Sequence, residues 1–335
     1  MNSKYRRSVF ALGSCALLLA PLGAIAQVAT DAKPADAKQT DPAPTGETYT
    51  LRLKFKQGDV NRYKTQIKST TVTPAGLGSE SKTIDATTDI VSEQKTTKLL
   101  DNGGAEIVTT LTNVVMNTGD KDTESPKLAP ITQQITAGAK VLSTKSAEDA
   151  SSDALKSVFT SSFSTPQSFL PDTAVKVGDK WTQKLTLSSA LGGKEGTVDC
   201  SFVRIETVNG VKTALIHAIM KAPIFTMITA MGQPTKVEGD AAAVLEGPFD
   251  SDTDIYFAID EGRIAKTTGS SNIALAIKPG KGLPPELAGL LPEGSKITMK
   301  SNAKMNLLAP GEKVTPPKTT ETTPETVKPE TPDKK

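Results

Sequence analysis

The chain has 335 residues, and its 39 Lys and Arg residues are nearly balanced by 37 Asp and Glu residues, which leaves a net charge of +2. The two signs are interspersed, so no strong positive field gathers nucleic acid, and an aromatic content of 4% offers few platforms for base stacking. The composition therefore excludes nucleic acid from the expected partners.

Residues 1–26 have the pattern of an export signal peptide. Arg6 and Arg7 belong to a positive n-region, an apolar run spans 9–22, and Ala-Ile-Ala ends the segment as a cleavage site. The run is shorter than the about 20 residues of a membrane span, so we expect no transmembrane span after cleavage. The signal predicts a bacterial protein that is periplasmic or extracellular. It leaves open Sec or twin-arginine export and a lipid anchor at Cys15.

Two segments are expected to be disordered because they are too polar and too rich in proline to form a core. They are the linker 27–47 and the Pro/Thr-rich tail 309–335, which flank a β-rich domain at 48–308. After signal cleavage Cys200 is the one cysteine, so no intrachain disulfide is possible. Burial and hydrogen bonds between strands must therefore stabilise the domain.

Apolar and polar residues alternate along much of the domain, which predicts antiparallel strands with one wet face. The pattern is clearest at 49–55 and 297–307. Turn sequences predict three hairpins, centred on 101–104, on Asn209-Gly210 and on 260–262, since Asn-Gly and a well-placed Gly accept the backbone of tight turns.

One main α-helix is expected at about 147–163, where apolar residues share a stripe at helical spacing. The helix separates two stretches of similar order, about 48–146 and 168–308, in which a Lys-x-Gly-Asp turn (56–59 and 176–179) precedes a strand and a long hairpin. The predicted fold class is mainly β, with one or more strongly curved antiparallel sheets from two related halves.

Two segments of the chain resemble the marks of a known family. They are Leu170 to Trp181, with Leu-Pro, Val175 and Gly-Asp between its ends, and Phe257 to Ile264. Both are typical of a family of uncharacterised exported bacterial proteins, and the resemblance covers most of 48–308. That family implies no assigned activity and no catalytic residues. The order of elements is also similar to the half-barrels of periplasmic lipoprotein carriers, in which a curved sheet wraps an apolar cavity.

His217 and Cys200 are the residues that a nucleophilic enzyme would need. Both lie in predicted strands, and a buried structural histidine and a small buried hydrophobe are the better interpretations. One His and one Cys are too few for a zinc site. We therefore expect no enzyme and no cofactor.

Asp250, Asp252 and Asp254 overlap the start of a calcium-loop pattern, with Glu261 at its twelfth position. Ile255 replaces the glycine that the loop needs for its bend, so a complete loop is not expected. Two interpretations stay open, which are a looser cation site on the three aspartates and a solvated acidic turn before a strand.

The apolar faces of the strands must point inward together, around either a solid core or a cavity. We expect an exported, non-enzymatic envelope protein that binds an apolar ligand or lipid on the concave side of its sheet. A surface-displayed module that binds envelope proteins or cell wall is the alternative. Trp181 either lines the ligand cleft or anchors its strand. The candidate lining residues are Leu53, Phe55, Trp181, Ile297, Met299, Met305 and Leu307.

Overall fold

A computed structural model gives the structure of the protein. It describes residues 46–75, 80–118, 122–124, 129–146, 169–187, 193–229, 234–235, 237–283, 294–312 and 314. The expected signal peptide at 1–26, most of the linker 27–47 and most of the tail 309–335 lie outside these residues. No helix in the described ranges is long and apolar enough to cross a membrane.

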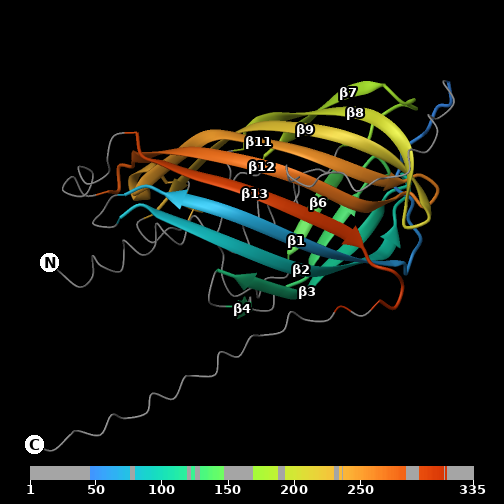
Figure 1. Ribbon diagram of the computed structural model, residues 1–335, viewed down its shortest axis with the longest axis horizontal. Helices are drawn as coiled ribbons and strands as arrows, with labels where there is room; N and C mark the ends of the chain where they lie inside the picture. The colour runs from blue at the N-terminus through green and yellow to red at the C-terminus, as the bar shows by residue number, and fades with distance from the viewer. Residues whose placement is uncertain are drawn as a thin grey trace, which may run out of the picture.

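The described residues form one antiparallel sheet of thirteen strands (Figure 1). Alternation of inward and outward side chains along these strands explains the period of two in the sequence. The strands are β1 (Val60–Thr73), β2 (Lys82–Leu99), β3 (Ala105–Asn117), β4 (Asp122–Glu124), β5 (Ile131–Ile135), β6 (Val141–Ser146), β7 (Lys180–Thr186), β8 (Glu195–Val208), β9 (Val211–Ile228), β10 (Pro234–Thr235), β11 (Ala243–Ala258), β12 (Arg263–Pro279) and β13 (Lys296–Leu307).

The strand order shows how the chain builds this sheet. Across the sheet the order is β6-β5-β3-β2-β1-β13-β12-β11-β9-β8-β7, with β4 beside β3 and β10 beside β9. The chain thus runs outward from β1 to one edge, begins again at the other edge with β7, and returns to the middle. There the first and last strands pair, with Tyr63 opposite Leu307.

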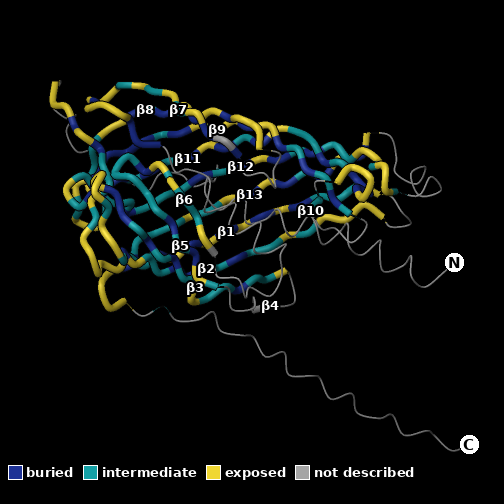
Figure 2. The backbone as a smooth tube through the Cα atoms, turned by 180° about the vertical axis from the view of Figure 1, so that it is seen from behind, coloured by how far each residue is buried: buried dark blue, intermediate teal, exposed yellow. Residues whose placement is uncertain are grey.

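The sheet is strongly curved. Figure 1 shows β6 behind β13 and β1, and Figure 2, seen from the opposite side, shows β5 and β6 in front of them. Sheets of more than about ten twisted strands curl in this way, and curling brings the two ends of the sheet over its own inner face.

The expected fold class is wrong in its main α-helix. Within the described ranges there is no α-helix, and the 3-10 turn η3 (Glu238–Asp240) is the one helical element there. The segment expected as the main helix, 147–163, lies outside the described residues. Strands from both expected halves join one continuous sheet. Because this sheet curls over its own apolar face, the described core needs no separate helical layer.

The expected hairpins and the last strand are confirmed. β8 and β9 meet at Asn209 and Gly210, whose φ angles of 51° and 80° are those of a primed two-residue turn. Gly262, with φ 61°, closes the β11–β12 hairpin, and the turn at 101–104 closes β2–β3. The alternation at 297–307 is strand β13.

The expected strand at 49–55 is wrong. This segment is extended but belongs to no strand, and its one ladder-like contact is an isolated bridge between Tyr49 and Val175. Tyr49 and Leu51 are buried all the same. Any extended chain on an apolar surface alternates with a period of two, so the pattern does not reveal whether a neighbouring strand is present.

The two Lys-x-Gly-Asp turns have the same geometry. Gly58 precedes β1 and Gly178 precedes β7, and both have positive φ angles. The N–H of Gly58 donates to the carbonyl oxygen of Thr96 on β2, and the N–H of Gly178 donates to that of Phe202 on β8. Such matched turns are what related halves would show. The relationship between the halves stays a prediction.

Buried residues alternate with intermediate and exposed ones along the strands (Figure 2), and the buried ones form the core on the inner face of the sheet. The large apolar cluster spans β7 to β13 and includes Phe202, Phe257 and Met299. A smaller cluster on β1, β2 and β3 contains Ile67, Ile90 and Leu111. Most of the large cluster therefore comes from the second part of the chain, whereas the strands of the first part also bury polar side chains, such as Thr96 and Thr109.

Candidate functional site

Residues 49–56, which we call the strap, lie across the end of the sheet at which β1 and β12 begin. The strap is attached through backbone hydrogen bonds from Tyr49 to Val175, from Leu53 to Ala137, and from Lys54 to Gly262. These partners lie in three separate parts of the chain. The strap therefore ties the loop after β5 and the β11–β12 turn to the segment before β7.

Gly262 is required where the strap meets the β11–β12 turn. Its φ angle is positive, and a Cβ at this position would lie 2.4 Å from Lys54 Cγ and 2.6 Å from the Lys54 backbone nitrogen. The Lys54 ammonium also donates to the carbonyl oxygen of Asp260, at 2.7 Å. Only a glycine permits this close approach of the two segments.

Between the strap, the β11–β12 turn and strands β1, β2, β3, β5 and β6 is a cavity of about 310 Å³. This volume corresponds to about ten water molecules. Apolar residues form much of its wall, and they are Leu53, Phe55, Tyr63, Ile107, Ile135, Ala139, Val141 and Ile264. Polar and charged residues complete it, and they are Lys54, Lys56, Asp59, Asn61, Gln94, Thr96, Thr109, Gln133, Glu261 and Arg263.

Three polar groups of the cavity are held close together. Arg263 Nη1 donates to Asn61 Oδ1 at 3.0 Å. Burial raises the pKa of Tyr63 from 10.0 to about 12, although the positive charge of Arg263 acts in the opposite direction. Tyr63 is therefore neutral at physiological pH and offers a hydroxyl group.

Two atoms of cavity residues are buried without a partner. Arg263 Nε and Glu261 Oε2 have no hydrogen-bond partner among the described residues. Leaving a buried donor or acceptor unpaired costs about 1–3 kcal/mol, and more when the group is charged. The cavity therefore has an apolar wall beside unsatisfied charged groups.

The structure places two of the predicted lining residues, Leu53 and Phe55, in the wall of this cavity. Ile297 and Met299 lie in the large apolar core instead. Trp181 packs against that core, and its Nε1 donates to the carbonyl oxygen of Phe169 at 3.0 Å. Met305 and Leu307, on the inner face of β13, are half-buried. None of these five residues lines the cavity.

Sequence reasoning missed Glu261 and Arg263 as cavity residues. The sequence patterns place Glu261 in a hairpin turn, a calcium-loop pattern and a family motif, and Arg263 in the same family motif. The available signal was a pair of opposite charges on either side of a turn glycine, next to a buried strand.

The three candidate metal ligands Asp250, Asp252 and Asp254 alternate with buried residues on β11 and so share its outer face. His217 on β9 lies opposite Asp254, and its Nδ1 is 3.1 Å from Asp254 Oδ1 and 3.5 Å from Asp252 Oδ1. His217 is thus a partly exposed surface residue paired with an acid. In the described ranges no group of three His, Cys, Asp or Glu side chains is arranged to hold a metal ion.

Cys200 lies in the large apolar core, on the opposite face of the sheet from His217, because its cross-strand neighbour is Ala218. Burial raises the pKa of its thiol from 9.0 to about 12, and the nearby Asp199 adds to the shift. These two residues therefore cannot form a nucleophile–base pair, and the thiol is a weak nucleophile at neutral pH.

Serines cross the middle of the inner face. Ser251, Ser271, Ser301 and Ser69 are opposite one another on four adjacent strands, and all are buried. Ser271 Oγ and Ser301 Oγ are 3.4 Å apart. On β11 the hydroxyl oxygens of Ser251 and Thr253 have no partner among the described residues. The concave face therefore contains a polar row that simple alternation does not reveal.

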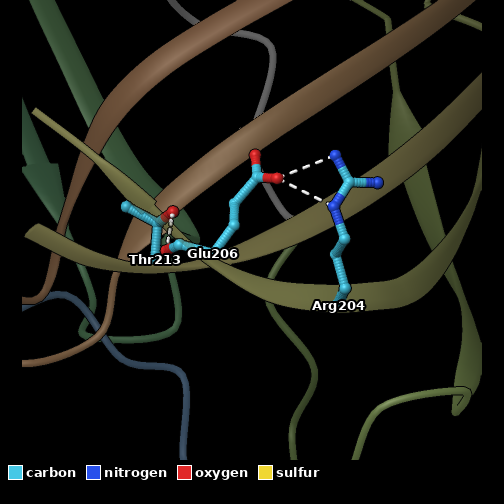
Figure 3. Close-up of polar contacts among 3 residues, drawn as sticks. All are labelled: Arg204, Glu206 and Thr213. Carbon is cyan, nitrogen blue, oxygen red and sulfur yellow. Dashed lines mark hydrogen bonds and ion pairs between the residues drawn. The ribbon is translucent and has the colours of Figure 1, made fainter. Parts of the chain in front are cut away.

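Two charged residues on the outer face of β8 form an ion pair with each other (Figure 3). Arg204 Nη2 is 2.7 Å from Glu206 Oε2, and Nε donates to the same oxygen at 2.8 Å. Thr213 Oγ1 donates to the backbone carbonyl of Glu206 at 2.9 Å. This surface pair is satisfied, unlike the charged groups of the cavity.

No family model and no curated protein sequence matches the chain. Solved structures that overlap it include lipovitellin, studied for its lipid–protein interactions, with a TM-score of 0.42, 10% identity, and coverage of 76% of this chain and 26% of that one. The chain thus spans about a quarter of the length of lipovitellin.

Two bacterial structures also overlap the chain. A Bacteroides fragilis protein with a YmcC-like fold has a TM-score of 0.25 and 10% identity, with coverage of 77% and 97% of the two chains. A LolA superfamily protein from Nitrosomonas europaea has a TM-score of 0.14 and 12% identity, with coverage of 77% and 89%. All three likenesses are loose, so the function is argued from the residues of this chain.

Proposed function

We propose that this chain is an exported protein that binds a small amphipathic ligand in the cavity beneath the strap, without catalysing a reaction. The observation that carries the proposal is the composition of the cavity wall. Apolar side chains such as Phe55 and Ile107 face the same space as Arg263 and Glu261. Ligand sites are typically apolar pockets with a few placed polar groups.

The volume limits the size of the ligand. Pockets for small molecules are commonly about 300–1,000 Å³, and this cavity, at about 310 Å³, is at the lower end. A short apolar chain with a polar end fits that space. A long-chain lipid would insert only part of its length.

Binding is preferred to catalysis because of how the reactive residues are arranged. Cys200 is buried on the inner face and His217 lies on the outer face, and neither lines the cavity. The charged residues that do line it can orient a ligand through hydrogen bonds.

The proposal is tested by filling the cavity. Ile107→Trp places a larger side chain in the wall and should weaken binding of a fluorescent fatty acid, 11-(dansylamino)undecanoate, at least tenfold in a fluorescence titration. The matched control is Ile219→Trp, since Ile219 is exposed on β9 and does not line the cavity. Circular dichroism checks that both variants fold, and Val141→Phe fills the same space with a smaller change.

Equal binding by the wild type and by both folded cavity variants would contradict the proposal. The alternative, a module that binds envelope proteins or cell wall, predicts such insensitivity, because its binding does not need the cavity.

A further inference from the structure

Two charged side chains flank the glycine of the β11–β12 turn and line the same cavity. Glu261 precedes Gly262 and Arg263 follows it. Oε2 of the first and Nε of the second are buried and lack hydrogen-bond partners among the described residues. No ion pair within 4.0 Å joins these two side chains in the described structure, so each keeps bonding capacity for a third group.

A pair on the outer face of the sheet shows that a spacing of two residues does not by itself keep an acid and an arginine apart. Arg204 and Glu206 are also two residues apart, yet they form a 2.7 Å ion pair (Figure 3). Residues i and i+2 of a strand lie on one face and can meet. At the turn, Gly262 has a φ angle of 61°, which separates the directions of its two neighbours. The turn therefore keeps a donor and an acceptor apart.

The other charged residues that line the cavity do not take the place of a ligand by pairing with Glu261 or Arg263. The Lys54 ammonium is already bound to the carbonyl oxygen of Asp260. Lys56 and Asp59 are exposed to water. Asn61 accepts one N–H of Arg263, and a guanidinium has five in all. Arg263 and Glu261 are thus the half-buried charged residues whose buried, unpaired atoms are available to a bound molecule.

The chemistry of these two groups specifies what they bind. A guanidinium favours a carboxylate or phosphate, and a carboxylate accepts hydrogen bonds from an ammonium group. Pairing both charged side chains at once requires a ligand that carries both signs. We infer that the cavity takes a zwitterionic head group on an apolar chain, with its acidic group at Arg263 and its ammonium at Glu261. This inference rests on the proposed function.

Two kinds of molecule have this chemistry, namely an aminophospholipid with one short chain and an apolar amino acid or dipeptide. The test is calorimetric titration of the full-length protein with lauroyl-lysophosphatidylethanolamine, laurate and dodecylamine, below their micelle concentrations, and with leucyl-leucine. At least one zwitterion should bind about tenfold more tightly than laurate and dodecylamine, since a hydrogen bond to a charged group is lost with each of the latter. The tighter zwitterion identifies the source.

Variants separate the two contacts. Glu261→Gln should weaken zwitterion binding about tenfold and leave laurate binding unchanged. Arg263→Gln should weaken binding of both zwitterion and laurate by about tenfold to a hundredfold and leave dodecylamine unchanged. Arg263→Lys, which keeps the charge, should restore part of the loss. The matched controls Arg204→Gln and Glu206→Gln, on the outer face, should change nothing.

The outcomes distinguish the two proposals. If Ile107→Trp blocks the probes but the head groups bind equally, or if Glu261→Gln binds every probe like the wild type, this inference is wrong and the proposed function stands. If none of the probes binds, both are wrong. Thermal unfolding of each variant confirms that a loss of affinity is not a loss of fold.

Discussion

At the scale of single residues, two threonines of the sheet have similar burial and different partners. Thr213, with 0% of its surface exposed, donates to the carbonyl oxygen of Glu206, whereas the hydroxyl of Thr253, 3% exposed, has no partner among the described residues. Valine has the same shape without the hydroxyl. The pair therefore isolates the effect of a buried hydrogen bond.

We predict opposite effects for the two substitutions. Thr253→Val should raise the free energy of unfolding by up to about 1 kcal/mol, because an unsatisfied hydroxyl leaves the interior. Thr213→Val should lower it by about 1–2 kcal/mol, because the carbonyl of Glu206 loses the hydrogen bond from the Thr213 hydroxyl. Urea unfolding measures both values. A loss of stability in Thr253→Val would indicate that its hydroxyl has a partner, such as a buried water.

The second residue-scale prediction concerns alkaline pH. The pKa of Cys200 is raised from 9.0 to about 12 by burial, and that of Tyr63 from 10.0 to about 12. Between these values the unfolded chain loses protons that the folded chain keeps, so the unfolded state binds fewer protons. The free energy of unfolding should therefore fall as the pH rises from about 9 to 12.

Urea titrations at several pH values test this slope, and Cys200→Ala should flatten its first part. The native thiol should also resist a disulfide reagent at pH 8 and react once urea unfolds the chain. Fast reaction of the native protein would contradict the buried position of Cys200.

At the scale of elements, the contact between the strap and the β11–β12 turn depends on one glycine. Gly262→Ala should lower the free energy of unfolding by about 2–3 kcal/mol, through backbone strain at positive φ and through collision with Lys54. It should also weaken ligand binding, because the strap forms one wall of the cavity. Thermal unfolding and the dansyl titration measure the two effects.

Gly103→Ala is the matched control for this contact. Gly103 also has a positive φ angle, of 75°, but a Cβ there meets nothing within 4 Å. It should cost only about 1 kcal/mol and leave binding unchanged. Equal effects of the two substitutions would show that the strap contributes nothing through Gly262.

Local patterns predicted the elements that local chemistry determines. Asn209-Gly210 specified its turn, and the alternation at 297–307 specified β13, because both depend on neighbours in the sequence. The strap shows where local patterns stop being sufficient. Its alternation predicts a strand, but whether an extended segment pairs with another strand depends on residues far away in the sequence, such as Val175.

The cavity was predictable only in part, for the same reason. Leu53 and Phe55 were expected to line it, since their apolar side chains repeat with period two. Met299 has the same pattern and lies in the core. Which inward positions meet a solid core and which meet a cavity depends on how the sheet curls and where the strap crosses, and neither leaves a local signal.

At the scale of the whole molecule, the two runs of strands are joined in the sheet by the pairing of β1 with β13. β13 lies in the middle of the sheet and carries Ile297 and Met299 into the core. A chain that ends after residue 295 should therefore lose cooperative thermal unfolding, whereas one that ends after 314 should keep it. A cooperative transition in the shorter chain, followed by circular dichroism, would contradict this.

Because β1 pairs with β13, the order of strands across the sheet is β7-β8-β9-β11-β12-β13-β1-β2-β3-β5-β6. This is the order of an up-and-down meander whose chain would begin at β7 and end at β6. A circular permutant that opens the chain between β6 and β7 and links residue 314 to residue 46 would retain every ladder while making its longest-range pairing a local one. Since folding slows as contacts become more distant in sequence, such a rearranged chain should refold faster than the natural one while unfolding at a similar rate.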